Sequence, residues 1–438
     1  MGSQNNVLLV TIDSLRADYV YGDGADTPAH DALADAGTVY ERAFSQGPFT
    51  TFSMPSLFTS RYPSELQYVE FSESTVGVYI DDEPTLPNAF RQAGYETAGF
   101  HSNPLLSNLF GFDRGFDAFD AQLPFSGTDA LPGRTKLLAD KFFRLVRKHP
   151  YLPAERINER ALDWIDRRDD DRPFFLWLHY MDVHGPYIAK DGLHYANKYR
   201  GEKLWRKAVT RPTEITDGER DRLLELYRTE VEYTDSCLGD LFAGARERGL
   251  WEDTVVVATA DHGEEFGAHG TYSHPHETYD ALTHVPLVVR DPAESFEPVD
   301  RPTELLDVAP SLLDRSGIPV PEAFSGRSLL DPTASTEAIA ISEADLVPEY
   351  HASVRDDRYR YVRNDVADRE FLYDTEQDPD EQHDVAGEHA DVRDRLSDVL
   401  DAHLATGTRE VGGEKGVERT DIDDEEVSTR LQDLGYLE

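Results

Sequence analysis

The segment Asn6-Val-Leu-Leu-Val-Thr-Ile-Asp13 decides how the fold is interpreted. It is a continuous run, rich in residues that favour β-structure, and it becomes polar only where it ends. A run of this kind is typical of a parallel strand that is buried on both faces of a sheet, because a half-exposed strand alternates apolar and polar residues. Asp13 therefore stands at the carboxyl end of a predicted buried strand.

Three further strand-like runs end in the same way, at side chains that bind cations or transfer protons. They are residues 97–100, leading to His101 and Asn103, residues 174–178, leading to His179, Asp182 and His184, and residues 254–260, leading to Asp261 and His262. Helical patterns lie between them, for example over 27–37 and 219–248. Alternating strands and helices predict an α/β domain, with a mainly parallel central sheet sandwiched by helices. Sheets of this type place their sites at the carboxyl ends of the strands.

Changes in the pattern and composition of the sequence divide the chain into three parts. Residues 1–330 are predicted to form the α/β domain. Residues 331–406 contain short strand-like pieces followed by a helical pattern near 388–404, which predicts a small C-terminal α+β subdomain. Residues 407–438 begin with a Gly-rich and acidic stretch, so they are expected to form a solvated acidic linker and a tail.

The chain is strongly acidic, with 85 Asp and Glu against 43 Lys and Arg and a formal net charge of −42. This charge argues against nucleic-acid binding, because a phosphate backbone would be repelled. A hydrophobic fraction of 39% argues against a disordered chain. The basic residues are 8 Lys and 35 Arg. Abundant acid with scarce Lys predicts adaptation to molar salt and a halophilic, archaeal source.

The sequence shows no feature of a membrane or secreted protein. No apolar run approaches the roughly 18 residues of a membrane helix, and the first residues lack a basic n-region. Cys237 is the one cysteine, so no disulfide can form within the chain. A soluble, cytoplasmic protein is expected, whose oligomeric state the sequence leaves open.

Asp13 and the pair Asp261-His262 predict a metal site. Two carboxylates and an imidazole at neighbouring strand ends, without basic partners nearby, need either a cation or protonation in order to coexist. A divalent metal is the simplest solution. The alternative for a single Asp at a strand end is that it caps a following helix.

The segment Pro48–Pro63 supplies hydroxyl groups at the start of a helix. Thr50, Thr51 and Ser53 precede an apolar helical turn, so one of them could simply cap that helix. The other interpretation is a nucleophilic hydroxyl at a helix N-terminus, where the helix dipole and a metal would favour the alkoxide.

Together these segments resemble the sulfatase branch of the alkaline phosphatase superfamily over nearly the whole chain. The resemblance is carried in order by residues 6–18, 27–37, 182–187, 259–264, 279–287, 307–313, 371–379 and 431–436. It implies an alkaline-phosphatase-like α/β fold.

The nucleophile segment departs from the family pattern. Sulfatases that carry formylglycine have a Cys or Ser followed by Pro two residues later and Arg four residues later. Ser53 is followed by Pro55, but Leu57 stands at the Arg position. Alignment on Thr59-Ser60-Arg61-Tyr62-Pro63 places Thr50 at the nucleophile position, with Ser53 as the alternative. Thr cannot become formylglycine, so none is expected.

The resemblance also implies roles for the polar residues at the strand ends. One divalent metal, Mn²⁺, Ca²⁺ or Zn²⁺, would be held by Asp13, Thr50, Asp261 and His262. His184 and His276 would hold the transferred group and protonate the leaving oxygen. Asn103, Arg61 and His179 would contact the substrate, unless Arg61 only braces its helix. A two-metal site is less favoured and would need further ligands, from His179, Asp182, His184, His269, His274 or His276.

The function that follows is a metal-dependent hydrolase of sulfate or phosphate esters, acting on a small molecule or a glycan through a covalent intermediate on Thr50. One alternative is an enzyme similar to phosphodiesterases or to phosphoglycerol and phosphoethanolamine transferases, which the Thr favours. A second is an inactive protein that binds sulfated or phosphorylated glycans.

Overall fold

The structure is a computed structural model, and it describes residues 5–72, 75–80, 83–121, 151–168, 172–187, 195–275, 277–293, 298–330, 339–346, 349–364, 367–406 and 418–419. Its centre is a seven-stranded sheet in the order β2-β13-β9-β1-β8-β6-β7. The strands are β1 (Asn6–Ile12), β2 (Thr38–Val39), β6 (Glu96–Phe100), β7 (Ala118–Asp120), β8 (Phe174–Tyr180), β9 (Thr254–Ala260) and β13 (Leu287–Arg290).

The central sheet is mainly parallel, as the sequence predicts. β1 lies between β8 and β9 and pairs parallel with both, and β6 and β7 continue the parallel order. β13 and β2 pair antiparallel at the other edge. Every residue of β1, β8 and β9 is buried, which explains their continuous apolar runs.

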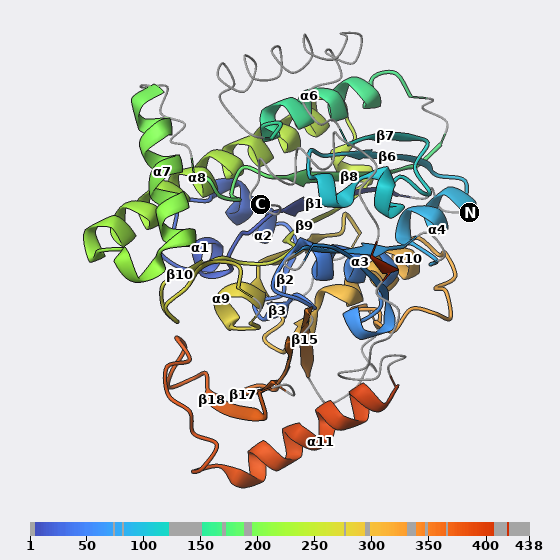
Figure 1. Cartoon of the computed structure of the whole chain (residues 1–438). Coiled ribbons are helices and arrows are strands. Elements are labelled where there is room, and N and C mark those ends of the chain that lie inside the picture. The colour runs from blue at the N-terminus through green and yellow to red at the C-terminus, as the bar shows by residue number, and fades with distance from the viewer. Residues whose placement is uncertain are drawn as a thin grey trace.

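Helices cover the sheet on both sides (Figure 1). One group consists of α2 (Pro28–Ala34), α6 (Ala154–Ile165) and α8 (Asp217–Glu247), in which α2 and α6 both pack against α8. A second group consists of α3 (Thr50–Thr59), α4 (Leu86–Gln92) and α10 (Val308–Arg315). The shorter and outlying elements are α1 (Asp18–Tyr21), β3 (Ala43–Phe44), β5 (Thr75–Tyr79), α7 (Tyr195–Thr210), β10 (Glu265–Phe266), β11 (Tyr272–Ser273), α9 (Asp280–Thr283), β12 (His284–Val285) and β14 (Thr303–Glu304). Among the helices of the described residues, none is both long and apolar enough to cross a membrane.

The C-terminal subdomain is an antiparallel sheet with one helix, drawn in orange and red in Figure 1. Its strands β15 (Ala340–Leu346), β16 (Glu349–Arg355), β17 (Tyr359–Asn364) and β18 (Arg369–Asp374) pair in chain order. Helix α11 (Ala390–Thr406) packs on β16 and β17. The subdomain has a small apolar core of its own, formed by Ile341, Ala352, Val354, Tyr361, Leu372, Leu396 and Leu400.

One part of the predicted linker is structured. Glu418–Arg419 form strand β19, which pairs parallel with β4 (Gln67–Ser72). The prediction of a solvated linker is therefore wrong at these two residues, because the edge of β4 offers backbone groups that pair with them. The rest of 407–438 lies outside the described residues.

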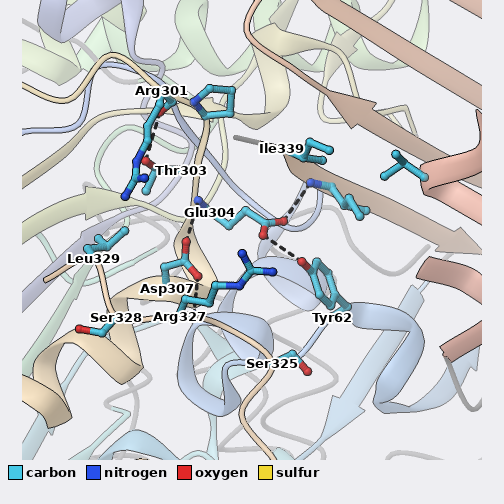
Figure 2. A pocket seen from close by; sticks show the side chains of 13 residues that line it. Tyr62, Arg301, Thr303, Glu304, Asp307, Ser325, Arg327, Ser328, Leu329 and Ile339 are labelled. Carbon is cyan, nitrogen blue, oxygen red and sulfur yellow. Dashed lines mark hydrogen bonds between the residues drawn. The ribbon is translucent and has the colours of Figure 1, made fainter. Parts of the chain in front are cut away.

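A cavity of about 230 Å³ lies between the α/β domain and the C-terminal subdomain (Figure 2). Glu304 lines it and accepts hydrogen bonds from Tyr62 Oη and from the Ile341 amide, each at 2.9 Å. Burial, together with the charge of Asp307, raises the pKa of Glu304 to about 8. Tyr62 follows the C-terminal end of α3, so this cavity is remote from Thr50 at the other end of the helix.

Candidate active site

The polar strand ends meet at the carboxyl edge of the central sheet, as predicted. Asp13 follows β1 and Asp261 follows β9, while the register places His179 of β8 beside Thr11 of β1. Asn103 follows β6, the next strand beyond β8. The side chains of all four polar residues are fully buried.

Asp13 is the centre of this cluster. Its Oδ2 accepts a hydrogen bond from Asn103 Nδ2 at 3.1 Å and lies 3.3 Å from His179 Nε2. Its Oδ1 accepts one from Ser14 Oγ at 3.0 Å. Burial alone would raise the pKa of Asp13, but His184, His179 and His262 outweigh it and hold that pKa well below its usual value.

Asp261 faces Asp13 from the neighbouring strand end. Its Oδ1 accepts hydrogen bonds from the amides of Ser14 at 3.2 Å and His262 at 2.8 Å. Ser14 has a positive φ of 61°, a left-handed conformation that turns the chain sharply after Asp13. Burial and the charge of Asp13 raise the pKa of Asp261 to about 8. Two buried carboxylates in this arrangement need either a cation between them or a proton on one of them.

The donor atoms fit a divalent metal ion. One oxygen each of Asp13 and Asp261 and one nitrogen of His179 all lie within 4.8 Å of one another. His262 Nε2 lies 3.6 Å from Asp13 Oδ1 and 3.6 Å from Asp261 Oδ2. His179, expected to contact the substrate, is thus placed among the candidate ligands. The register of β1 and β8 explains this placement, because it brings His179 level with Thr11.

Thr50 brings its hydroxyl into the same cluster from the first residue of α3. Its Oγ1 lies 2.9 Å from Asp261 Oδ2, 3.3 Å from Asp13 Oδ2 and 3.5 Å from His262 Nε2. Within the described residues no side chain caps α3, so the capping interpretation of this segment is wrong. Ser53 lies one turn further along α3, and its Oγ donates to the Phe49 carbonyl at 3.3 Å.

A group of imidazoles lies beside the carboxylates. The ring of His274 is 5.0 Å from that of His262 and 5.3 Å from that of His184, measured between centroids. Burial lowers the pKa of His184 and of His262. The sequence suggested His274 only as an extra ligand of a two-metal site. His276, the predicted partner of His184, lies outside the described residues.

Two residues that were predicted to contact the substrate, Arg61 and Asn103, make other contacts in the structure. Arg61 forms an ion pair with Glu83 at 2.6 Å, and α3, ten residues or about 15 Å long, separates it from the cluster. A substrate contact by Arg61 does not fit this position, and the alternative of bracing the helix does. Asn103 uses its amide on Asp13, and its Oδ1 accepts the Leu105 amide at 2.9 Å. Its contacts therefore orient a carboxylate.

Two of the residues considered for a second metal are engaged elsewhere. Asp182 Oδ2 accepts the Ala154 amide at 2.8 Å, at the start of α6. His269 lies 3.3 Å from Glu265 and stacks on Tyr279 with a centroid distance of 3.5 Å. These contacts favour a one-metal arrangement.

The parallel sheet with buried carboxylates, imidazoles and a hydroxyl at its carboxyl edge is the architecture of an alkaline phosphatase superfamily hydrolase. The chain belongs to the sulfatase family, whose model matches residues 5–318. A second model, N-sulphoglucosamine sulphohydrolase C-terminal, matches residues 267–406.

Individual relatives agree with this assignment. The chain is 27% identical to the uncharacterized sulfatase YidJ of Escherichia coli, over 90% of this chain and 86% of YidJ. The phosphonate monoester hydrolase of Silicibacter pomeroyi has a similar fold, with a TM-score of 0.73, 23% identity, and 93% of this chain and 96% of that one covered. The solved structure of BT4656 in complex with its substrate D-glucosamine-2-N,6-O-disulfate has a TM-score of 0.70 at 17% identity, covering 94% of this chain and 100% of that one.

Proposed function

We propose that the chain is a metal-dependent hydrolase of sulfate or phosphate esters that acts through a covalent intermediate on Thr50. The observation that carries the proposal is the position of Thr50 Oγ1, 2.9 Å from Asp261 and 3.3 Å from Asp13 at the start of a buried helix. A hydroxyl at a helix N-terminus beside buried carboxylates is placed to act as a nucleophile once a cation is present.

The segment after Thr50 supports a nucleophile without formylglycine. The residues two and four positions beyond Thr50 are Phe52 and Met54, both fully buried, where the formylglycine motif has Pro and Arg. Thr, unlike Cys or Ser, also cannot be converted to formylglycine.

The residues that would hold the metal are Asp13, Asp261 and His262 with Thr50, and His179 is the additional candidate. The mixture of carboxylate and imidazole donors favours Mn²⁺ or Zn²⁺ over Ca²⁺. When bound, such a cation supplies positive charge that offsets the negative charge of the transferred group and favours the alkoxide of Thr50.

Side chains of the protein carry out the bond formation and the proton transfers. Thr50 Oγ releases its proton to water and forms a bond to sulfur or phosphorus while the bond to the leaving oxygen breaks, and an imidazole gives the leaving oxygen a proton. We assign this proton transfer to His184 or to the neighbouring His274. His276 remains a candidate for the same role. Water then gives a proton back to that imidazole and attacks the same sulfur or phosphorus. Thr50 leaves and takes up a proton from water, and sulfate or phosphate is released.

The substrate class is proposed from the relatives. BT4656 takes a disulfated glucosamine, which favours a sulfated glycan or a small sulfate ester here. The likeness to a phosphonate monoester hydrolase keeps an enzyme for phosphodiesters or phosphonates, or a transferase, as the alternative. An inactive glycan-binding protein is disfavoured by the intact ligand cluster.

The charge of −42 leads us to propose a halophilic enzyme. An anionic ester reaches an anionic protein readily only where salt screens the surface. Activity and melting temperature should therefore rise with salt concentration toward the molar range.

The test is a panel of aryl sulfate, aryl phosphate and aryl phosphodiester, assayed in high salt with Mn²⁺, Ca²⁺ or Zn²⁺. Hydrolysis of the sulfate supports the leading proposal, and preference for the phosphodiester supports the alternative. Absence of turnover on all three would favour the binding protein. Full activity after dialysis against EDTA would contradict the proposed requirement for a metal ion.

A further inference from the structure

Helix α9 supports the backbone that follows His262. The amide of Gly263 donates to Leu282 O at 2.7 Å, and the amide of Glu264 donates to Ala281 O at 2.9 Å. The approach is close, because a Cβ at position 263 would lie 2.1 Å from Ala281 O. The position of Asp261 and His262 therefore depends on where α9 lies.

The C-terminal subdomain holds the start of α9 through a buried arginine. Arg360 of β17 is 1% exposed, and its guanidinium donates to Thr278 Oγ1 at 2.8 Å and also to the Thr278 carbonyl. It forms an ion pair with Glu381 at 2.6 Å. The other oxygen of Glu381 accepts the amide of Asp280, the first residue of α9, at 2.8 Å.

A second arginine completes a charge-balanced group. Arg355 of β16 forms an ion pair with Asp280, so two arginines face two carboxylates. A buried group of this kind is sensitive to the removal of one member, because the remaining charge is left without compensation. The group joins the subdomain to Thr278–Asp280, and α9 joins that segment to Gly263 and Glu264.

We propose that Arg360 is a positioning residue for the metal-binding segment: it sets the place of α9, and through α9 the place of Asp261 and His262. The C-terminal subdomain thereby completes a site to which it contributes no ligand among the described residues. The part that concerns metal binding rests on the proposed function, whereas the backbone connection stands on the hydrogen bonds alone.

The test compares Arg360→Lys with Arg358→Lys in the full chain. Arg360→Lys keeps the buried charge beside Glu381 but loses the forked contact with Thr278. Arg358 is the matched control, because it directly precedes β17 and its ion pair with Asp374 at 2.5 Å stays within the subdomain. Two readouts are used: hydrogen exchange of the Gly263 and Glu264 amides, and Mn²⁺ affinity by calorimetry.

We expect Arg360→Lys to speed exchange at both amides and to weaken Mn²⁺ binding by about tenfold, the size typical for residues that support a ligand. Arg358→Lys should change neither. If Arg360→Lys does not fold, Arg360→Met combined with Glu381→Gln removes both charges and takes its place. A folded variant with the exchange rates and Mn²⁺ affinity of Arg358→Lys would overturn the proposal. If the wild type binds no Mn²⁺, the proposed function fails, and the exchange rates alone decide the role of Arg360.

Discussion

The hydroxyl of Thr11 lies 2.9 Å from Nδ1 of His179, on adjacent strands of the central sheet. The same hydroxyl accepts a hydrogen bond from Trp177 Nε1 at 3.0 Å and donates to Leu178 O at 3.3 Å. A carbonyl can only accept, so all three contacts are hydrogen bonds only if His179 Nδ1 carries the proton. Nε2 then presents its lone pair to the cluster, 3.3 Å from Asp13 Oδ2, which suits a metal ligand.

Thr11→Val should weaken metal binding. Val has nearly the shape of Thr but cannot accept from His179, so the imidazole loses its orientation, with an expected loss of about tenfold in Mn²⁺ affinity. Calorimetry on the metal-free protein measures it. Thr259→Val is the matched control, because Thr259 pairs with Thr11 in the sheet but donates to Pro286 O at 2.8 Å. Equal affinities in the two variants would remove His179 from the ligand set.

Metal affinity should rise with pH. Because the pKa of Asp261 is raised to about 8, the metal must displace a proton below that pH. Affinity is expected to increase by about tenfold per pH unit up to pH 8 and then to level off. Calorimetry across pH 6.5–9 measures this slope. An affinity independent of pH over that range would show that Asp261 is ionised in the metal-free protein.

The metal-free protein should lose stability as the pH rises from about 5 to about 8, and the loss should level off above that. Asp261 and Glu304 have folded pKa values of about 8, well above their unfolded values, so each stabilises the fold fully at low pH and loses that contribution as pH rises through 8. Thermal melts with and without Mn²⁺ test this. Bound Mn²⁺ should abolish the part of this stability loss that depends on Asp261. Asp261→Asn should abolish the same part. Glu304→Gln, at the remote cavity, should leave the response to metal intact.

Gly263→Ala should disrupt the site. The added methyl would meet Ala281 O at 2.1 Å, and backbone has little freedom to retreat, so a loss of about 1–3 kcal/mol is expected. Metal affinity should fall with it. Gly239→Ala in α8 is the control, because its Cβ has only Ala29 Cβ nearby, at 3.5 Å. The control should raise stability by up to about 1 kcal/mol. A metal affinity of Gly263→Ala equal to that of the control would contradict the role of α9.

Arg61→Met should leave catalysis nearly unchanged. Its ion pair with Glu83 is partly exposed, so the expected loss of stability is below about 1 kcal/mol. The ratio kcat/KM on an aryl ester measures the effect. A fall comparable to that of a site variant would restore Arg61 as a substrate contact.

The sequence predicts the central sheet and its polar edge because buried parallel strands are continuous apolar runs, and β1, β8 and β9 are of that kind. Strand β16 was not predicted, since Glu349–Arg355 mixes polar and apolar residues. Arg61 follows α3 in sequence, but that helix separates it from the site. His274 and Arg360 are brought to their places by contacts between distant segments, which no local pattern reveals.

The most direct test of the central claim is kcat/KM of Thr50→Ala beside Ser53→Ala, on an ester that the wild type hydrolyses with Mn²⁺. The two hydroxyls lie one turn apart in α3, and only that of Thr50 contacts Asp13 and Asp261. We expect Thr50→Ala to lose at least about 10³-fold with the melting temperature near that of the wild type, and Ser53→Ala to keep most of its activity. Undiminished turnover in Thr50→Ala would contradict the account.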